Sequence, residues 1–354
     1  MKRILAINPG STSTKIGIFE DDKLVLEKKV EHSADELKDF ARVADQFEYR
    51  KEVLLSVLAQ ENLKPESFDA IVGRGGLMKP IVSGTYHVSD AMLEDFREAK
   101  YGEHASNLGA MIATALAEEG TPAYIVDPVV VDELDPIARI SGLKGIERVS
   151  IFHALNQKAV AKRYAAETGT PYDQLNLIVA HLGGGVSVAA HKKGRCVDVN
   201  NALDGEGPFS PERTGGLPVR DVIRLSYSGE YSDKDLRKQF VGKGGLVSYF
   251  GTQDAREVQK MGAEGNEEAK LVYDAMGYQV AKEIAANAAV LHGEVDAILL
   301  TGGIAYDKEF VGKIEKAVSW IAKVVVYPGE DELEALAQGA LRCLTGEEEA
   351  RIYD

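Results

Sequence analysis

The alternation of apolar and polar residues predicts that the chain opens with an antiparallel β-meander. An apolar segment at 3–8 is broken by Pro9 and Gly10. Two further segments, 15–20 and 24–30, follow with the alternation of period two that is typical of strands. We therefore expect three consecutive strands, with a tight turn after the first.

The same order of segments recurs in the second half of the chain. An apolar segment at 175–180 runs into HLGGG, an alternating segment follows at 186–191, and a third lies at 195–200. Asn8 and His181 stand at equivalent ends of the two first strands. The pattern predicts an internal duplication. Two mixed α/β units of this kind favour a nucleotide cleft between domains, at the ends of strands.

Between these strands the apolar period lengthens to that of helices. Ser33 to Glu36 fits a capping box, S-x-x-E, that opens a long helical stretch. Helices are expected at about 36–62, 104–119, 152–168, 219–228, 254–261, 267–291 and 331–344. Additional strands are expected at 68–73, 123–126, 296–300 and 323–326.

Length and charge narrow the class of protein. A chain of 354 residues is more than one ordinary domain. Its net charge of −15 should repel nucleic acid and anionic membranes, so we expect neither as a partner, and an anionic substrate needs a local basic pocket. No apolar run is long enough for a signal peptide or a membrane span, which predicts a cytoplasmic protein. Cys196 and Cys343 match no metal or redox spacing.

The first chemical motif is NPGSTSTK, at residues 8–15. Gly10 permits a tight turn in which backbone N–H groups can face phosphate oxygens, and Ser11 and Ser13 add hydroxyl donors. Lys15 adds a positive charge, and the amide oxygen of Asn8 is a possible Mg²⁺ ligand. An ordinary hairpin turn rich in Ser and Thr is the alternative interpretation.

Two glycine-rich turns follow later strands. In HLGGGVS, three consecutive glycines after an apolar strand favour close approach of the backbone to a phosphate, because glycine weakens regular structure. His181 in this motif can donate to a transferring phosphoryl group, although a structural histidine is common at such a position. The second turn, TGGIA at 301–305, leaves room for a ribose or adenine, but a plain strand-to-helix turn fits it as well.

Five other side chains are candidates for charge recognition or catalysis. Arg74 in VGRGG and Arg213 in GPFSPERTGG lie beside glycines, and Arg is the side chain best shaped to grip a carboxylate or phosphate. His104 and His153 lie at predicted helix starts, where capping or core roles compete with catalysis. Asp127 follows a predicted strand, and Pro128 makes a turn its competing role.

Taken together, the motifs resemble the butyrate kinase branch of the acetate kinase family. The resemblance runs from residue 8 to residue 305 and is therefore more specific than any one motif. The segments that carry it are NPGSTSTK, EHASNLGA, VDPVVVDEL, SIFHALNQ, HLGGGVS, NNALDGEGPFSPER and TGGIA.

The resemblance implies an α/β protein with the duplicated actin-like superfold of acetate and sugar kinases, Hsp70 and actin. It implies two domains with ATP in the cleft between them, Mg²⁺ as the metal, and an acyl phosphate product. We expect an N-terminal domain at 1–145 and a C-terminal domain at 146–332 that carries the adenosine site. The final helix, about 333–354, is expected to pack back on the first domain.

The resemblance also assigns residues that hold ATP. They belong to two phosphate loops and one adenosine segment. These residues are Asn8, Ser11, Ser13 and Lys15 in the first loop, His181, Gly183, Gly184 and Gly185 in the second, and Gly302, Gly303 and Ile304 in the adenosine segment.

The resemblance implies catalytic roles for Arg74, Asp127, His153, His181 and Arg213. The two arginines hold the carboxylate and the phosphoryl group in flight. The acyl pocket is expected at Gly75, His104 and Phe152. Mg²⁺ is expected at Asn8 and at one of Glu330, Asp331 and Glu332, of which we favour Glu332.

The predicted reaction is reversible, direct, in-line transfer of a phosphoryl group between ATP and a short-chain carboxylate. True acetate kinases carry more bulk after the equivalent of Arg74, whereas this chain has only Gly75, Gly76 and Leu77, which favours butyrate or isobutyrate. The alternatives are propionate or acetate, a sugar as acceptor, or a non-catalytic ATP-binding protein of the same superfold. We also expect a homo-oligomer, a dimer or larger.

Overall fold

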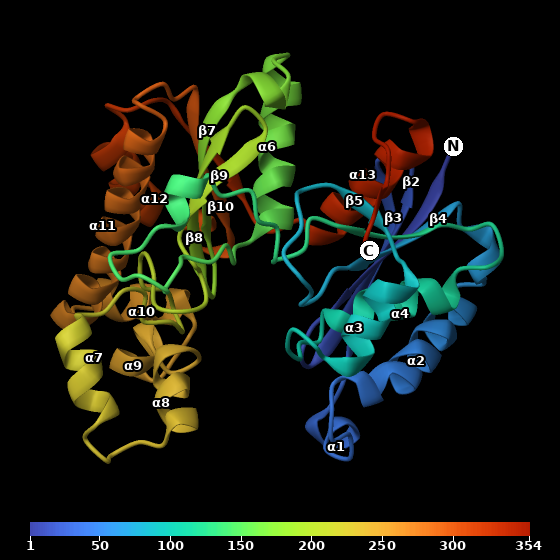
Figure 1. Cartoon of the computed structure of the whole chain (residues 1–354), viewed down its shortest axis with the longest axis horizontal. Helices are drawn as coiled ribbons and strands as arrows, with labels where there is room; N and C mark the ends of the chain where they lie inside the picture. Colours follow the sequence, from blue (N-terminus) through green and yellow to red (C-terminus); the bar gives the residue numbers. More distant parts are fainter. The chain divides into compact units, whose positions relative to one another are not determined.

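The computed structural model describes residues 1–354 apart from the side chain of Ala34, and it divides into two compact units (Figure 1). The first comprises Met1–Val131 together with Asp331–Asp354, and the second comprises Asp132–Glu330. The division falls at Val131, whereas the expected boundary was near residue 145. Residues 132–145 therefore pack with the second unit.

The first unit is built on a seven-stranded sheet with the order β12-β5-β6-β4-β1-β2-β3. The three N-terminal strands form the expected antiparallel meander, and β4 and β6 add to it in parallel with β1. The strands are β1 (Arg3–Pro9), β2 (Ser13–Glu20), β3 (Lys23–Glu31), β4 (Ala70–Arg74), β5 (Thr85–His87), β6 (Ala123–Val126) and β12 (Arg351–Ile352).

Helices cover both faces of this sheet. Leu54 and Leu58 of one helix, α2, join the cluster that contains Ile7 and Ile71 of the sheet. The last helix, α13, packs on the opposite face, where a side chain at Gly339 would meet Val126. The helices are α1 (Ala34–Leu37), α2 (Phe47–Gln60), α3 (Asp90–Glu98), α4 (Asn107–Leu116) and α13 (Glu332–Thr345), with 3-10 turns at Ala44–Gln46 and Pro65–Ser67.

The single long helix expected at 36–62 is wrong. The capping box at Ser33 and Glu36 is present, but it opens only the short helix α1. Beyond it, the carboxylate of Asp45 accepts the backbone N–H of Arg42 at 3.0 Å, and helical structure resumes with the 3-10 turn that precedes α2. A side chain that bonds a nearby backbone N–H offers the chain an alternative to the helix.

The second unit repeats the strand plan of the first. Its five-stranded sheet has the order β11-β10-β7-β8-β9, which matches β6-β4-β1-β2-β3 strand for strand and direction for direction. Asn8 and His181 are each the sixth residue of their seven-residue strands, so the expected duplication is confirmed. The strands are β7 (Asn176–Leu182), β8 (Val186–Lys192), β9 (Arg195–Val199), β10 (Ala297–Gly302) and β11 (Val324–Pro328).

The second sheet is also covered on both faces. Val280 and Ile284 of α11 pack against Ile178 and its neighbours, whereas α6 packs with Val179 and Leu299 on the other face. Three short helices that the sequence did not reveal, α5, α8 and α9, belong to this unit. Its helices are α5 (Pro136–Arg139), α6 (Ala154–Thr168), α7 (Val219–Ser226), α8 (Asp233–Phe240), α9 (Gly245–Phe250), α10 (Ala255–Ala263), α11 (Glu267–Val290) and α12 (Lys308–Val318), with 3-10 turns at Tyr172–Gln174 and Gly303–Tyr306.

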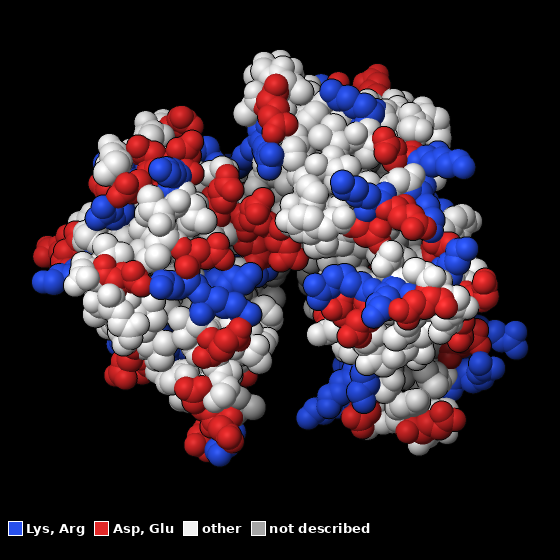
Figure 2. Space-filling model, turned by 180° about the vertical axis from the view of Figure 1, so that it is seen from behind, with Lys and Arg blue, Asp and Glu red and all other residues white. Residues whose placement is uncertain are grey.

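The surface reflects the charge of the chain. On the face drawn in Figure 2, acidic and basic side chains are interspersed, and the acidic ones form several groups. Among the described residues, no helix combines the length and the apolar character that crossing a membrane requires.

Candidate active site

Three candidate residues of the first unit meet at the carboxyl ends of two neighbouring central strands, β1 and β4. Asn8 lies near the end of β1, Arg74 ends the parallel neighbour β4, and Glu332 begins α13. The guanidinium of Arg74 grips the carboxylate of Glu332 with Nη1 and Nη2, each 3.0 Å from an oxygen. Asn8 donates to Glu332 through Nδ2 at 2.5 Å and accepts from Arg74 Nη1 through Oδ1 at 3.2 Å. Of the three acidic residues considered for the metal, the fold brings Glu332 to Asn8.

The turn between β1 and β2, together with the start of β2, carries the remaining residues of the first predicted phosphate site. Gly10 donates its N–H to the carbonyl of Ser13 at 2.7 Å, which closes the turn. Ser11 and Lys15 are exposed and Ser13 is half-buried. Lys15 is the register partner of Asn8 across the hairpin. This part of the hairpin therefore presents the hydroxyls of Ser11 and Ser13 and the ammonium group of Lys15 close to Asn8.

Asp127 follows β6 and is held firmly. Its backbone has a φ of +38°, and the residue is 2% exposed. Its Oδ1 accepts from the hydroxyl of Ser83 at 2.6 Å and from the N–H of Gly84 at 2.8 Å. These bonds tie the carboxylate to the segment that leads into β5. Its predicted role with the metal or an arginine stays a prediction.

Two of the predicted acyl-pocket residues have clear local partners. A side chain at Gly75 would place its Cβ 2.7 Å from Pro128 and 3.1 Å from Ile125, so this glycine lets the segment after β4 pack on its own domain. His104 is exposed, and its Nδ1 lies 2.8 Å from the hydroxyl of Ser106 and accepts the N–H of that residue. The absence of bulk at Gly75 is thus explained by packing.

In the second unit, two histidines from different elements stack face to face. His181 of β7 and His153, which precedes α6, have ring centroids 3.8 Å apart and an interplanar angle of 10°. His181 Nδ1 lies 2.8 Å from Oδ1 of Asn156, whose amide donates to the carbonyl of Glu330. Because that amide oxygen only accepts, the hydrogen-bond network assigns a proton to His181 Nδ1. Its Nε2 is 3.6 Å from the Glu330 carboxylate.

His153 is oriented by a hydroxyl. Ser187 Oγ accepts from the side chain of Gln157 at 2.8 Å and from the backbone N–H of His153 at 3.5 Å. The hydroxyl proton of Ser187 is then directed at His153 Nδ1, 2.9 Å away. Both imidazoles are therefore fixed by neutral partners. Phe152, the third pocket candidate, directly precedes His153 and is 2% exposed.

The three glycines after β7 have three different surroundings. A Cβ at Gly183 would lie 2.9 Å from Nε2 of His181. A Cβ at Gly185 would lie 2.0 Å from Nη1 of Arg213. At Gly184 nothing comes nearer than Glu212, 3.6 Å away. Gly183 and Gly185 thus make room for candidate catalytic side chains, whereas Gly184 has only an ordinary van der Waals neighbour in Glu212 and lines a cavity.

Arg213 is a half-buried cation with an incomplete set of partners. Its Nη1 donates to the carbonyl of Ala202 at 2.6 Å, and its Nη2 lies 3.7 Å from the Glu212 carboxylate. Its Nε is buried and has no hydrogen-bond partner among the described residues. Burial lowers the pKa of Arg213 below the usual range. A buried donor of this kind is suited to an anionic ligand.

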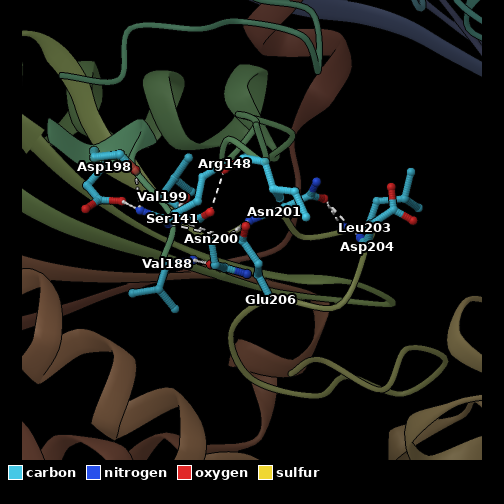
Figure 3. Close-up of polar contacts among 12 residues, drawn as sticks. Ser141, Arg148, Val188, Asp198, Val199, Asn200, Asn201, Leu203, Asp204 and Glu206 are labelled. Carbon is cyan, nitrogen blue, oxygen red and sulfur yellow. Dashed lines mark hydrogen bonds and ion pairs between the residues drawn. The ribbon is translucent and has the colours of Figure 1, made fainter. Parts of the chain in front are cut away.

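A network around Arg148 holds the loop that carries Ala202 (Figure 3). Arg148 donates from Nη1 to Asp198 at 2.8 Å, and its Nε lies 3.3 Å from Glu206. Asp198 lies in β9 and Glu206 lies in the loop that follows it, so the two carboxylates flank the stretch that contains Ala202. The network fixes the carbonyl that receives Arg213.

A cavity of about 1060 Å³ opens within the second unit beside these glycines. Its lining includes Gly184 and the predicted adenosine residues Gly303 and Ile304. Gly302 lies just before them with a φ of +92°, and a Cβ there would lie 2.3 Å from the Leu182 carbonyl. The second phosphate loop and the adenosine segment therefore border one cavity, of nucleotide size.

Sequence reasoning missed two polar residues of this cavity, Asp254 and Arg256. They form a two-bond ion pair at 2.9 and 2.6 Å, and Asp254 caps α10. The hydrogen bonds from Arg256 lower the pKa of Asp254 to about 2. An acid and an arginine two residues apart at a predicted helix start were the available signal.

The amino-acid sequence matches a known family over most of its length. The model described as "Acetokinase family" matches residues 140–336. Butyrate kinase 2 of Clostridium acetobutylicum is 57% identical over 352 residues, which is 99% of each chain. Butyrate kinase 1 of the same organism is 56% identical over the full length of both chains. The chain belongs to the acetokinase family.

Solved structures agree with the acetokinase fold. Acetate kinase of Porphyromonas gingivalis has a TM-score of 0.78 at 20% identity, over 96% of this chain and 99% of that one. A propionate kinase from Francisella tularensis has a TM-score of 0.75 at 18% identity, with the same coverage. At these identities the likeness concerns the fold, which is the predicted actin-like α/β superfold in duplicate.

Membership of the acetokinase family implies ATP or ADP and a divalent cation. The described residues contain no group of three or more His, Cys, Asp or Glu that could enclose a metal. Asn8 Oδ1 and the Glu332 carboxylate are neighbouring oxygen donors. This donor set fits a cation that keeps waters and binds together with phosphates.

Proposed function

We propose that this acetokinase transfers the γ-phosphoryl group of ATP to butyrate, reversibly and in one direct step. The observation that carries the proposal is the match at 57% and 56% identity, over nearly the whole chain, to two proteins named butyrate kinase. The candidate residues in each unit supply the groups that this chemistry uses.

The reaction needs alignment and charge neutralisation more than proton transfer. A short-chain acid has a pKa near that of Glu, about 4–5, so it is ionised at pH 7. A carboxylate oxygen attacks the γ-phosphorus, and the bond from that phosphorus to the bridging oxygen of ADP breaks. ADP leaves with the electron pair, and no proton has to move. Catalysis of this kind rests on positioning and electrostatic stabilisation.

The two arginines have the shape for this task. Arg74 already holds a carboxylate, that of Glu332, with both arms of its guanidinium, which illustrates the bidentate grip proposed for the substrate. Arg213 has a buried Nε without a partner among the described residues. We assign one arginine to the attacking carboxylate and both to the screening of negative charge, as the family resemblance implies.

The histidines act as oriented donors in this proposal. His181 Nδ1 is engaged with Asn156, so Nε2 is the ring nitrogen that this proposal assigns to a phosphoryl oxygen. His153 lies against the same ring and is placed near the transferring group. Asp127 is assigned an orienting role, because a carboxylate nucleophile requires no base.

The nucleotide is assigned to the two loops and the cavity. Ser11, Ser13, Lys15 and the glycines at 183–185 bind phosphates, and adenosine binds at Gly302, Gly303 and Ile304. We propose Mg²⁺ as the cation, held by Asn8 and Glu332 together with phosphate oxygens. When bound, it neutralises charge on the β- and γ-phosphates.

Butyrate is proposed over shorter acids on energetic grounds as well. Two further methylenes separate butyrate from acetate, and each contributes about 0.8 kcal/mol if the pocket buries it. The total of about 1.6 kcal/mol corresponds to roughly 15-fold in kcat/KM. His104 and Phe152 are the remaining candidates for the acyl pocket, because Gly75 packs against Pro128 and Ile125.

The test is a hydroxylamine trap for acyl phosphate, run with ATP and a series of acids from acetate to valerate, isobutyrate included. The proposal expects butyrate or isobutyrate to exceed acetate by about tenfold in kcat/KM. An equal kcat/KM for acetate would refute butyrate as the preferred substrate but would leave the carboxylate kinase activity in place. Phosphorylation of a sugar alone, or ATP binding without any product, would refute the carboxylate kinase itself.

We also propose that the enzyme works in the cytoplasm as a homo-oligomer. Four exposed apolar side chains within ten residues, Ile137, Ile140, Leu143 and Ile146, support self-association, because exposed apolar surface is often covered by a partner when it is grouped. Sedimentation at several concentrations measures the state directly. A monomer at all of them would remove the oligomer from the proposal.

A further inference from the structure

The first phosphate loop rests on a buried arginine that no motif revealed. Arg50 lies on α2, and its side chain is the largest of those that are fully buried, at 1% exposed. It donates to the backbone carbonyls of Gly10 at 2.8 Å, Ser11 at 3.0 Å and Ser13 at 3.3 Å. Three carbonyls of one short turn thus converge on a single guanidinium.

This arrangement orients the other side of the turn. In a trans peptide the C=O of one residue and the N–H of the next point in opposite directions. Because the carbonyls of Gly10 and Ser11 face Arg50, the N–H groups of Ser11 and Thr12 face away from it. Both residues are exposed. Successive N–H groups turned outward form a concave site for an anion.

The charge of Arg50 is not balanced within the protein. No described carboxylate lies within ion-pair distance of it. Its other acceptors are the hydroxyl of Thr14 at 3.2 Å and the amide oxygen of Gln46, which receives Nε at 3.1 Å and Nη2 at 2.8 Å. Buried arginines are almost always paired, because an uncompensated buried charge is costly. An anion bound at the turn would supply the missing charge.

We propose that Arg50 is a positioning residue for the polyphosphate of ATP: it shapes the turn at residues 10–13 through its hydrogen bonds and attracts the phosphates through its unpaired charge. The inference rests on the proposed function in one respect, that the anion is the nucleotide. Arg50 itself is buried behind the turn, so it acts through the loop and does not touch the substrate.

Gln46→Glu tests the charge of Arg50 separately from its hydrogen bonds to the turn. The substitution is nearly isosteric and keeps both acceptor bonds, but it gives Arg50 a carboxylate partner. The melting temperature should stay equal or rise, while the Kd for ATP, measured by calorimetry, weakens about tenfold, or about 1.4 kcal/mol. Adenosine affinity should not change. The matched control is Gln60→Glu, the same change at the exposed far end of α2.

Arg50→Lys provides the complementary test. It keeps the charge and loses the forked hydrogen bonds to the turn, so the melting temperature should fall and the Kd for ATP should weaken, but by less than in Gln46→Glu. If this variant does not fold, Gln46→Glu still decides. If Gln46→Glu binds ATP as tightly as Gln60→Glu, Arg50 contributes only to stability and the proposal is overturned. Failure of the proposed function looks different: ATP binds, but butyrate yields no acyl phosphate.

Discussion

Gly185→Ala should disable the enzyme through Arg213. The added Cβ would lie 2.0 Å from Nη1 of Arg213 and 2.8 Å from its Cζ, far inside van der Waals contact. The guanidinium must therefore leave its place and its 2.6 Å bond to the Ala202 carbonyl. Loss of one preorganised donor to a transition-state charge costs about 2.7–4 kcal/mol, which is roughly 10²- to 10³-fold in rate.

The neighbouring glycine provides the control. At Gly184 the nearest atom to an added Cβ is 3.6 Å away, so Gly184→Ala changes the loop without moving Arg213. We expect kcat/KM for butyrate to fall about 100-fold or more in Gly185→Ala and much less in Gly184→Ala. The assay is acyl hydroxamate formation, with melting temperatures to exclude unfolding.

A double variant tests whether Gly185→Ala lowers activity by displacing Arg213. If Gly185 acts only by making room for Arg213, then Gly185→Ala added to Arg213→Met costs little beyond Arg213→Met alone. Additive losses would show that the glycine matters for another reason. Activity in Gly185→Ala within about threefold of the unmodified enzyme would refute the reasoning, because the displaced arginine would then be dispensable.

Three other substitutions follow from the same geometry. Arg74→Lys keeps the charge but loses the two-armed grip, so kcat/KM should fall about 100-fold with the fold intact; near-normal turnover would remove this arginine from the mechanism. Gly184→Val should weaken ATP binding about tenfold without lowering the melting temperature in the absence of ATP, and a drop in that temperature would mark a packing glycine. Gly75→Val should destabilise the protein by about 1–3 kcal/mol through the contact with Pro128 and leave the ratio of butyrate to acetate use unchanged; a changed ratio at unchanged stability would restore a pocket role.

The sequence predicted those features that local patterns encode. Strands with period two and the glycine turns after β1 and β7 are local, and so both meanders and the duplication were predicted correctly. The break between α1 and α2 depends on Asp45 accepting a backbone N–H, which a periodicity argument overlooks. The short helices α8 and α9 span only eight and six residues, which is too short for the period of a helix to be recognised in the sequence.

Tertiary contacts explain the rest. Glu332 was favoured over Glu330 without a way to fix the register, and only the start of α13 decides that Glu332 reaches Asn8. Gly75 was interpreted as space for a substrate because acetate kinases carry more bulk there, and its contact with Pro128, which is distant in sequence, could not be foreseen. Arg50 belongs to no motif at all. Its importance depends on where α2 packs.

The chain order of the two units has a consequence for synthesis. Residues 132–330 form one uninterrupted unit, whereas the first unit needs residues 331–354. Leu336 and Ala340 of α13 are fully buried there. The internal unit can therefore complete its core without the C-terminal segment, whereas the core of residues 1–131 stays partly uncovered until α13 packs on it. The half of the enzyme that is translated first is the half that finishes folding last.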